Sequence, residues 1–172
     1  GLFVATAINS LGSGYRVMTS PDGVNWTIQS SAADSNWQSV TYGQVNGQGL
    51  FVASSIIQNV NNLMTSPDGV TWTLLSTVPY LVLNSITYGA NLYASVASNS
   101  CLNDNNYYTS VVTSSNGIAW SYQVCPANSW TSVVCGQVSG SDLMVAVSNS
   151  GTGNRVMTSS NGTGWASRTS PA

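Results

Sequence analysis

Five aspartates are the only carboxylate side chains in this chain of 172 residues, and they restrict the acid–base chemistry that it could perform. A hydrolase that works with two carboxyl groups would have to use aspartates alone, because there is no glutamate. Asp22 and Asp68 belong to Pro-Asp-Gly turns, and Asp34, Asp104 and Asp142 fall in three separate loops. We interpret the last three as solvated loop carboxylates and expect no catalytic residues and no enzyme activity.

Nucleophilic and metal chemistry also lack their usual residues. A serine or cysteine nucleophile needs a base such as histidine, and the chain has none. Cys101, Cys125 and Cys135 include no Cys-x-x-Cys pair of the kind that binds zinc. The run Asn103-Asp104-Asn105-Asn106 gathers oxygen ligands that suit calcium, although it lacks the spacing of an EF-hand loop. We expect this run to be a polar surface turn, with calcium as the alternative, and we expect no cofactor.

The most regular feature of the chain is a segment that occurs four times. Residues 19–27, Thr-Ser-Pro-Asp-Gly-Val-Asn-Trp-Thr, recur as residues 65–73, and weaker copies cover 114–120 and 159–165. In every copy a serine precedes a tryptophan by six residues, and the tryptophans lie 46, 48 and 45 residues apart, at Trp26, Trp72, Trp120 and Trp165. A period in this range is typical of repeat proteins, whose units bury apolar surface against their neighbours.

Each repeat divides into four short segments that are rich in β-branched and aromatic residues and bounded by Gly, Pro, Asn or Ser, as strands are. The first kind of segment covers 37–43, 83–89 and 130–136; the second 1–5, 49–53, 91–95 and 142–146; the third 16–20, 63–66, 110–114 and 155–159; the fourth 26–29, 72–75, 120–123 and 165–168. Repeated units of four strands predict an all-β fold, a β-propeller of four-stranded antiparallel blades. We expect one domain over 1–172, with repeats at about 1–36, 37–82, 83–129 and 130–172.

The connection between the third and fourth segments is the tightest in each repeat. Pro21 suits the first corner of a type I turn, Asp22 follows, and Gly23 can take the left-handed conformation that closes a hairpin with a bulge. The same structural turn is predicted in the other three repeats, at Asp68-Gly69, Asn116-Gly117 and Asn161-Gly162.

These turn segments, Ser-Pro-Asp-Gly-x-x-Trp, resemble the Asp-box (BNR) repeat of sialidase-like β-propellers, which is written Ser-x-Asp-x-Gly-x-x-Trp. The copies here are one residue shorter between Asp and Trp, and Asn116 and Asn161 replace the aspartate in the last two. The resemblance implies that the box is a structural turn between strands three and four, with the strand at 37–43 innermost in its blade. It also implies a non-catalytic member, because a sialidase site needs an arginine cluster and a Tyr/Glu pair, and this chain has three arginines and no glutamate.

One inner strand is missing from this pattern. The chain has four copies of the second, third and fourth segments but only three of the first, since Gly1 begins a segment of the second kind. Residues 1–5 should therefore expose an open strand edge, which a longer parent chain or an adjacent subunit would complete. Strand donation between subunits would give self-association into a filament or surface layer, and this structural role is the function that we expect.

Composition favours an extracellular or cell-surface protein. Charged residues make up 5% of the chain and the net charge is -2, whereas about a quarter of the residues in an average soluble domain are charged. Asn25 and Asn161 begin Asn-x-Thr sequons that suit N-glycosylation. Three scattered arginines cannot form the basic patch that nucleic acid requires, and no apolar run is long enough for membrane insertion.

Loop lengths suggest a second candidate function. The connections between strands two and three, and those from strand four to the next inner strand, vary in length and should share one face of the disc. Variable loops on a rigid scaffold often form a binding surface, so a lectin-like, glycan-binding propeller is the alternative. We place Cys101 and Cys125 on this face and predict a disulfide bond between them, whereas Cys135 should be a free, buried thiol.

Overall fold

The computed structural model describes residues 1–8, 14–57, 62–76, 81–102 and 108–171, and the side chains of 99–102, 108 and 109 are not described. Within these ranges every regular element is a β-strand, and the strands form four antiparallel sheets. The first sheet has three strands, whereas the second, third and fourth sheets have four each. Each sheet is a meander in which strands that follow each other in the chain pair with each other.

The four sheets correspond to the four repeats. The first sheet contains β1 (Phe3–Thr6), β2 (Val17–Ser20) and β3 (Thr27–Gln29). The second contains β4 (Trp37–Val45), β5 (Gln48–Ser55), β6 (Leu63–Ser66) and β7 (Thr73–Leu74). The third contains β8 (Leu83–Gly89), β9 (Leu92–Leu102), β10 (Tyr108–Ser114) and β11 (Ser121–Gln123). The fourth contains β12 (Trp130–Val138), β13 (Ser141–Ser148), β14 (Val156–Ser159) and β15 (Ala166–Arg168).

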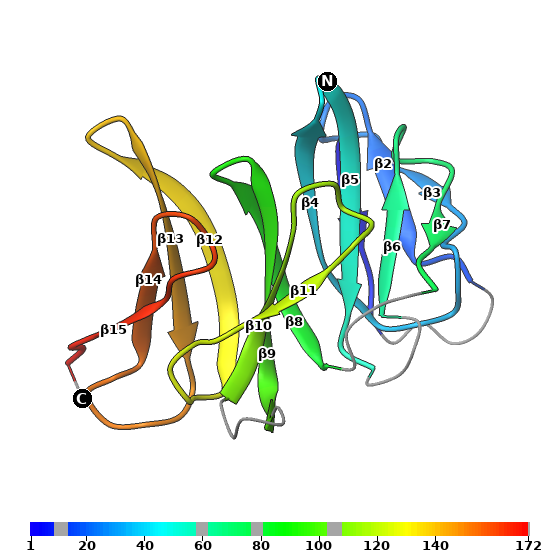
Figure 1. Ribbon diagram of the computed structural model, residues 1–172. Coiled ribbons are helices and arrows are strands. Elements are labelled where there is room, and N and C mark those ends of the chain that lie inside the picture. Colours follow the sequence, from blue (N-terminus) through cyan, green and yellow to red (C-terminus); the bar gives the residue numbers. More distant parts are fainter. Residues whose placement is uncertain (9–13, 58–61, 77–80, 103–107, 172) are drawn as a thin grey trace.

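The sheets stand side by side in chain order and form an open row (Figure 1). Strands β4, β8 and β12 lie next to one another along this row. Backbone amides of one of these strands donate to hydroxyls of the preceding one: Ile86 N to Ser39 Oγ at 3.2 Å and Val133 N to Ser85 Oγ at 3.2 Å. These two amides point towards the neighbouring sheet and have no strand of their own sheet on that side. The serine hydroxyls therefore provide their hydrogen-bond acceptors.

The described residues form three hydrophobic core clusters, one between each pair of neighbouring sheets. Trp37 and Trp130, which begin the inner strands of the second and fourth sheets, are completely buried in two of these clusters. Each sheet therefore buries its apolar side chains against the next sheet, as expected for a repeat protein.

Within the described residues, the first sheet lacks the inner strand that the other three have. Strand β1 pairs with β2 in the register Phe3↔Ser20 to Thr6↔Val17 and is the edge of its sheet. Its equivalents β5, β9 and β13 each pair on the other side with an inner strand, namely β4, β8 and β12. The open edge expected from the repeat count is thus present at Phe3–Thr6.

Candidate interaction surface at the open strand edge

Four equivalent turns join the third and fourth strands of the sheets. In the second sheet, Ser66 Oγ accepts a hydrogen bond from Gly69 N at 2.8 Å, and Asp68 Oδ1 accepts from the amides of Val70 at 2.9 Å and Thr71 at 2.7 Å. The indole of Trp72 then donates to Gly69 O at 3.0 Å. The aspartate or asparagine and the tryptophan make the same bonds in the other copies.

The glycine of each turn adopts the left-handed conformation expected for it, with φ between 72° and 76° at Gly23, Gly69, Gly117 and Gly162. The amide bonds from Thr71 and Val70 hold the pKa of the Asp68 carboxyl at about 2, and bonds from Asn25 and Val24 hold the pKa of Asp22 well below its usual range. Asn116 and Asn161 make the same bonds without a charge, so the turn requires an acceptor oxygen rather than a carboxylate.

The turns also connect neighbouring sheets. A Cβ atom on Gly69 would lie 2.8 Å from Leu2 Cδ2, and one on Gly117 would lie 2.6 Å from Leu50 Cδ2. In the same way a Cβ on Gly162 would lie 2.7 Å from Leu92 Cδ1. The turns of the second, third and fourth sheets therefore each pack on a leucine in or next to the second-kind strand of the preceding sheet, and only glycine leaves room for this leucine.

The open edge of β1 borders an apolar hollow. A cavity of about 200 Å³ lies between β1 and β4, and its lining includes Phe3, Val4, Val40 and Tyr42. A second cavity of about 510 Å³ adjoins it and shares Leu2, Tyr42 and Phe51 as lining residues. In the second and third sheets an inner strand lies at the corresponding place. The hollow therefore has the position of the strand that the first sheet lacks.

The internal equivalents show how an inner strand is held at this place. Tyr88 of β8, the counterpart of Tyr42, donates from its hydroxyl to Gln44 O of β4 at 2.6 Å. A Cβ atom on Gly43 of β4 would clash with the Tyr88 ring, so the glycine makes room for the ring. Tyr42 on β4 has no such strand beneath it, and half of its surface is exposed.

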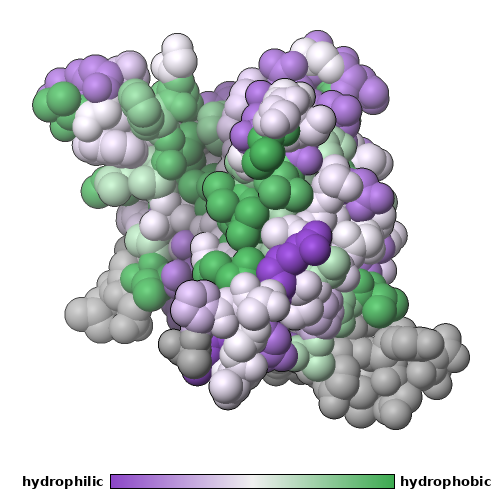
Figure 2. Space-filling model, turned by 90° about the vertical axis from the view of Figure 1, so that its left-hand side faces the viewer, coloured by the Kyte–Doolittle hydropathy of each residue, from purple (hydrophilic) through white to green (hydrophobic). Residues whose placement is uncertain are grey.

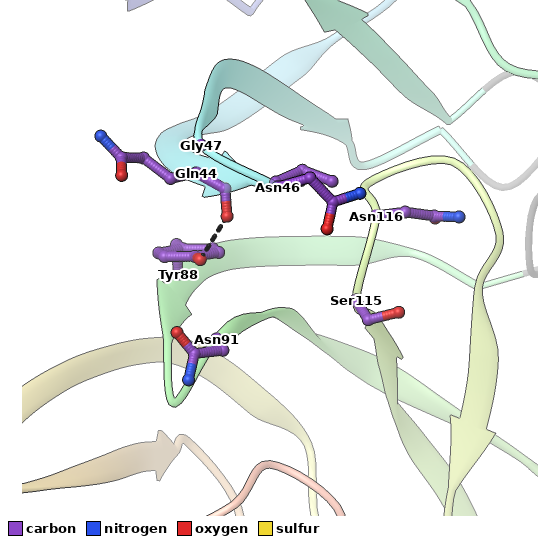
Figure 3. A pocket seen from close by; sticks show the side chains of 8 residues that line it. Gln44, Asn46, Gly47, Tyr88, Asn91, Ser115 and Asn116 are labelled. Atoms are coloured by element: carbon purple, nitrogen blue, oxygen red, sulfur yellow. Dashed lines mark hydrogen bonds between the residues drawn. The ribbon is translucent and has the colours of Figure 1, made fainter.

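A polar hollow of about 680 Å³ lies elsewhere, between the second and third sheets (Figure 3). Its lining comes from the end of β4, the β4–β5 turn, the end of β8, the β8–β9 turn and the box turn of the third sheet: Gln44, Val45, Asn46, Gly47, Tyr88, Asn91, Ser115 and Asn116. The strand directions put this hollow on the face of the box turns, opposite the variable loops. The sequence gives no hint of it, because its residues come from two different repeats.

The variable loops contact one another where they are described. Asn128 Nδ2 donates to Asn154 O at 2.8 Å, and Ser129 N donates to Ser150 Oγ at 2.8 Å. In the first sheet, Ser31 N donates to Gly14 O at 2.7 Å. Loops of the two variable sets therefore lie on the same side of the row, although four of the loops fall partly outside the described residues.

The described aspartates outside the box turns have structural partners. Asp34 Oδ1 forms an ion pair with the buried Arg16 at 2.5 Å, and Asp142 Oδ2 accepts from Ala90 N of the neighbouring sheet at 2.6 Å. Asp104 and the rest of the run 103–106 lie outside the described residues. Among the described residues, no group of three or more cysteines and carboxylates could hold a metal ion.

The cysteines differ from expectation in three ways. Cys101 pairs with Thr109 within the β9–β10 ladder instead of lying in a loop, because β9 extends to Leu102. Cys125 has a free, buried thiol, so this structure does not contain the predicted Cys101–Cys125 disulfide bond. Cys135 is also free but only half-buried rather than buried. Burial raises the pKa of both free thiols.

Both sequon asparagines are exposed and take part in box turns. Asn25 Nδ2, the atom that a glycan would occupy, donates to Asp22 Oδ2 at 2.8 Å. Asn161 uses its Oδ1 atom as the acceptor of its turn. The described residues contain no helix with the length and apolarity needed to cross a membrane.

Comparison with known proteins gives little similarity in sequence. No protein-family model matches the chain, and no curated protein matches it. Among solved structures, the chain is similar to one titled Bacteroides ovatus Xyloglucan PUL GH43B, with a TM-score of 0.46 and 14% sequence identity. The match covers 91% of this chain and 36% of that one, so the present chain spans about a third of its length.

Proposed function

We propose that the chain is a non-enzymatic, extracellular assembly module. In this proposal its four sheets are blades of a β-propeller, and a strand from a neighbouring subunit completes the first blade. The observation that carries the proposal is the apolar hollow between β1 and β4, at the place where the other sheets have their inner strand. An added strand would pair with the edge of β1 through backbone hydrogen bonds, a known mode of peptide recognition.

The hollow suits a strand with the pattern Trp-x-Ser-Val-x-Tyr-Gly. Its serine would accept a hydrogen bond from Val40 N, as Ser39 does from Ile86 N. Its glycine would leave room for the Tyr42 ring, as Gly43 does for Tyr88. The Tyr42 hydroxyl would then reach a carbonyl of the added strand. An exposed strand edge is a template on which another strand can pair, which supports a partner strand at this place.

The absence of enzyme activity in this proposal is supported by the separate structural bonds of Asp34 and Asp142. The chain also has no glutamate and no histidine that could act as acid or base. The low charge and the exposed sequon asparagines support the extracellular location and glycosylation.

A peptide with the sequence of residues 37–45 tests strand completion. We expect the fluorescently labelled peptide to bind the protein and to slow amide hydrogen exchange in β1. The matched control is the same peptide with Gly43→Val, which should bind at least about tenfold more weakly, because the new side chain occupies the space of the Tyr42 ring. Equal binding of both peptides, or no protection of β1 amides, would contradict the proposal.

Glycan binding is the second candidate function, and the polar hollow of Figure 3 is the observation that favours it. Amide side chains from Gln44, Asn46 and Asn91 could bond to sugar hydroxyls, and Tyr88 supplies an aromatic ring at the same place. A glycan array with the wild type and the Asn91→Ala variant tests this function. Binding of the wild type to a glycan, with loss of this binding in Asn91→Ala, would support glycan binding at this hollow. If the wild type binds no glycan on the array, the glycans tested are excluded as ligands.

A further inference from the structure

The two outer faces of the row expose apolar side chains, and several of these have equivalents that are buried between the sheets. On the first sheet, Trp26 is 40% exposed and Met18 is 41% exposed, whereas their equivalents Trp72 and Met64 are 9% and 0% exposed. The side chain of Ile28, opposite Met18 in the β2–β3 ladder, is also exposed. We call the surface formed by Phe3, Met18, Trp26 and Ile28 the head face.

The fourth sheet has the complementary feature at the other end of the row. Val134 on β12 is 61% exposed, whereas its equivalent Thr87 is 8% exposed and accepts a bond from Cys135 N of the next sheet. Val147 on β13 is 43% exposed, and its equivalent Val96 is completely buried. We call the surface formed by Val134, Val138, Leu143, Val145 and Val147 the tail face. Figure 2 looks at this end of the molecule, and apolar side chains gather over its middle.

The internal interfaces show what each face is shaped to contact. In all three, a leucine from one sheet lies over the box-turn glycine of the next: Leu2 over Gly69, Leu50 over Gly117 and Leu92 over Gly162. Leu143 is the equivalent leucine of the fourth sheet, on the tail face. Gly23 is the equivalent glycine of the first sheet, and a Cβ there would meet only Phe3 of its own sheet, at 3.6 Å or more. In the single chain Leu143 and Gly23 therefore do not form the leucine–glycine contact that their equivalents form.

We propose that the tail face of one copy of this chain docks on the head face of a second copy, with Leu143 of the first over Gly23 of the second. The proposal rests on the assembly function proposed above and names the partner, a second copy in head-to-tail contact. The interface repeats the internal packing of the first sheet on the second, in which Met64 and Trp72 are buried. A hollow of about 100 Å³ on the head face, lined by Ala5, Val17, Met18 and Ile28 among others, offers room for an apolar side chain of the tail.

Head-to-tail docking joins two different surfaces, so it propagates until it closes a ring or forms a filament. Two substitutions block the faces separately: Ile28→Asp on the head and Val134→Asp on the tail. Both positions are exposed in the single chain, so the variants should fold. Ile118→Asp is the matched control, because Ile118 is 56% exposed but belongs to a box turn of the third sheet, outside both faces.

Molar mass measured by light scattering after size separation gives the test. We expect the wild type and Ile118→Asp to exceed the monomer mass of 17.9 kDa and each face variant to run as a monomer. An equimolar mixture of the two face variants should give a dimer, because one intact head and one intact tail remain. A monomeric wild type, self-association of either face variant, or a mixture that stays monomeric would overturn the proposal.

The peptide of residues 37–45 separates this inference from strand completion. If the faces dock, the face variants lose assembly while they still bind the peptide at β1. If strand completion alone drives assembly, excess peptide dissociates the wild-type assembly and the face variants assemble normally. This result would overturn face docking but would agree with the proposed function. If the peptide does not bind and assembly depends on both faces, strand completion is overturned and face docking is supported.

Discussion

Leu2 lies over the α-carbon of Gly69, so close that a Cβ atom on this glycine would be 2.8 Å from Leu2 Cδ2. Gly23 stands in an identical Ser-Pro-Asp-Gly turn with the same left-handed φ, but no neighbouring sheet covers it. Glycine can be required at this turn for two reasons. Gly23 and Gly69 both need the left-handed backbone conformation, but only Gly69 also has a neighbouring side chain close to its α-carbon.

Substitution of these two glycines by alanine should therefore have different costs. Gly23→Ala should lower the free energy of unfolding by about 1 kcal/mol through the left-handed conformation alone. Gly69→Ala should cost about 1–3 kcal/mol more, because Leu2 and Val4 must also move. Denaturant unfolding of monomeric protein measures both. Equal losses for the two variants would show that the leucine contact is not tight.

Asp68 should make stability sensitive to acid. Its folded pKa of about 2 is lower than the ordinary value of 3.8, so the unfolded chain binds the proton more readily. The stabilising contribution is present in full above about pH 5 and is lost as the pH falls towards the folded pKa. Asp68→Asn keeps the acceptor oxygen, as Asn116 does, but cannot titrate.

Thermal unfolding between about pH 5 and pH 2 checks this expectation. The wild type should lose more stability over this range than Asp68→Asn does. The reverse exchange, Asn116→Asp, should add acid sensitivity to the third sheet. Identical pH profiles for wild type and Asp68→Asn would contradict the assigned hydrogen bonds.

The hydroxyl of Ser85 is predicted to stabilise the contact between the inner strands of the third and fourth sheets. Ser85→Ala removes the acceptor for Val133 N and should lower the free energy of unfolding by about 1–3 kcal/mol. Ser132→Ala is the matched control, because Ser132 is the equivalent residue of the fourth sheet and is exposed in the single chain. Chemical denaturation of monomeric protein should show little change for the control.

Cys125 and Cys135 should differ in reactivity. Cys125 is buried and burial raises the pKa of its thiol, so alkylation in the folded protein should be slow. Cys135 is half-buried and should react first, which peptide mapping after timed iodoacetamide treatment would show. The disulfide bond between Cys101 and Cys125 stays a prediction for oxidised protein, to be tested by intact mass with and without reductant.

The sequence by itself determined the box turns and the strand pattern of each repeat. The hydrogen bonds that shape the turn at Ser66, Asp68, Gly69 and Trp72 join residues three positions apart, so the turn is predictable from a short stretch of sequence. The three strands of the first described sheet were predictable too, because the sequence contains three segments of the first kind and four of each other kind.

Only the tertiary structure decided which copies of these identical motifs are covered. Contacts such as Ser39 with Ile86 or Asn84 with Trp130 join residues 46 or 47 positions apart, and their formation depends on how one sheet stands against the next. The polar hollow has the same origin, because its lining comes from both the second and the third sheets. Trp26 and Trp72 carry the same local sequence, but Trp72 is buried by the sheet before it and Trp26 is not, because no described sheet lies there.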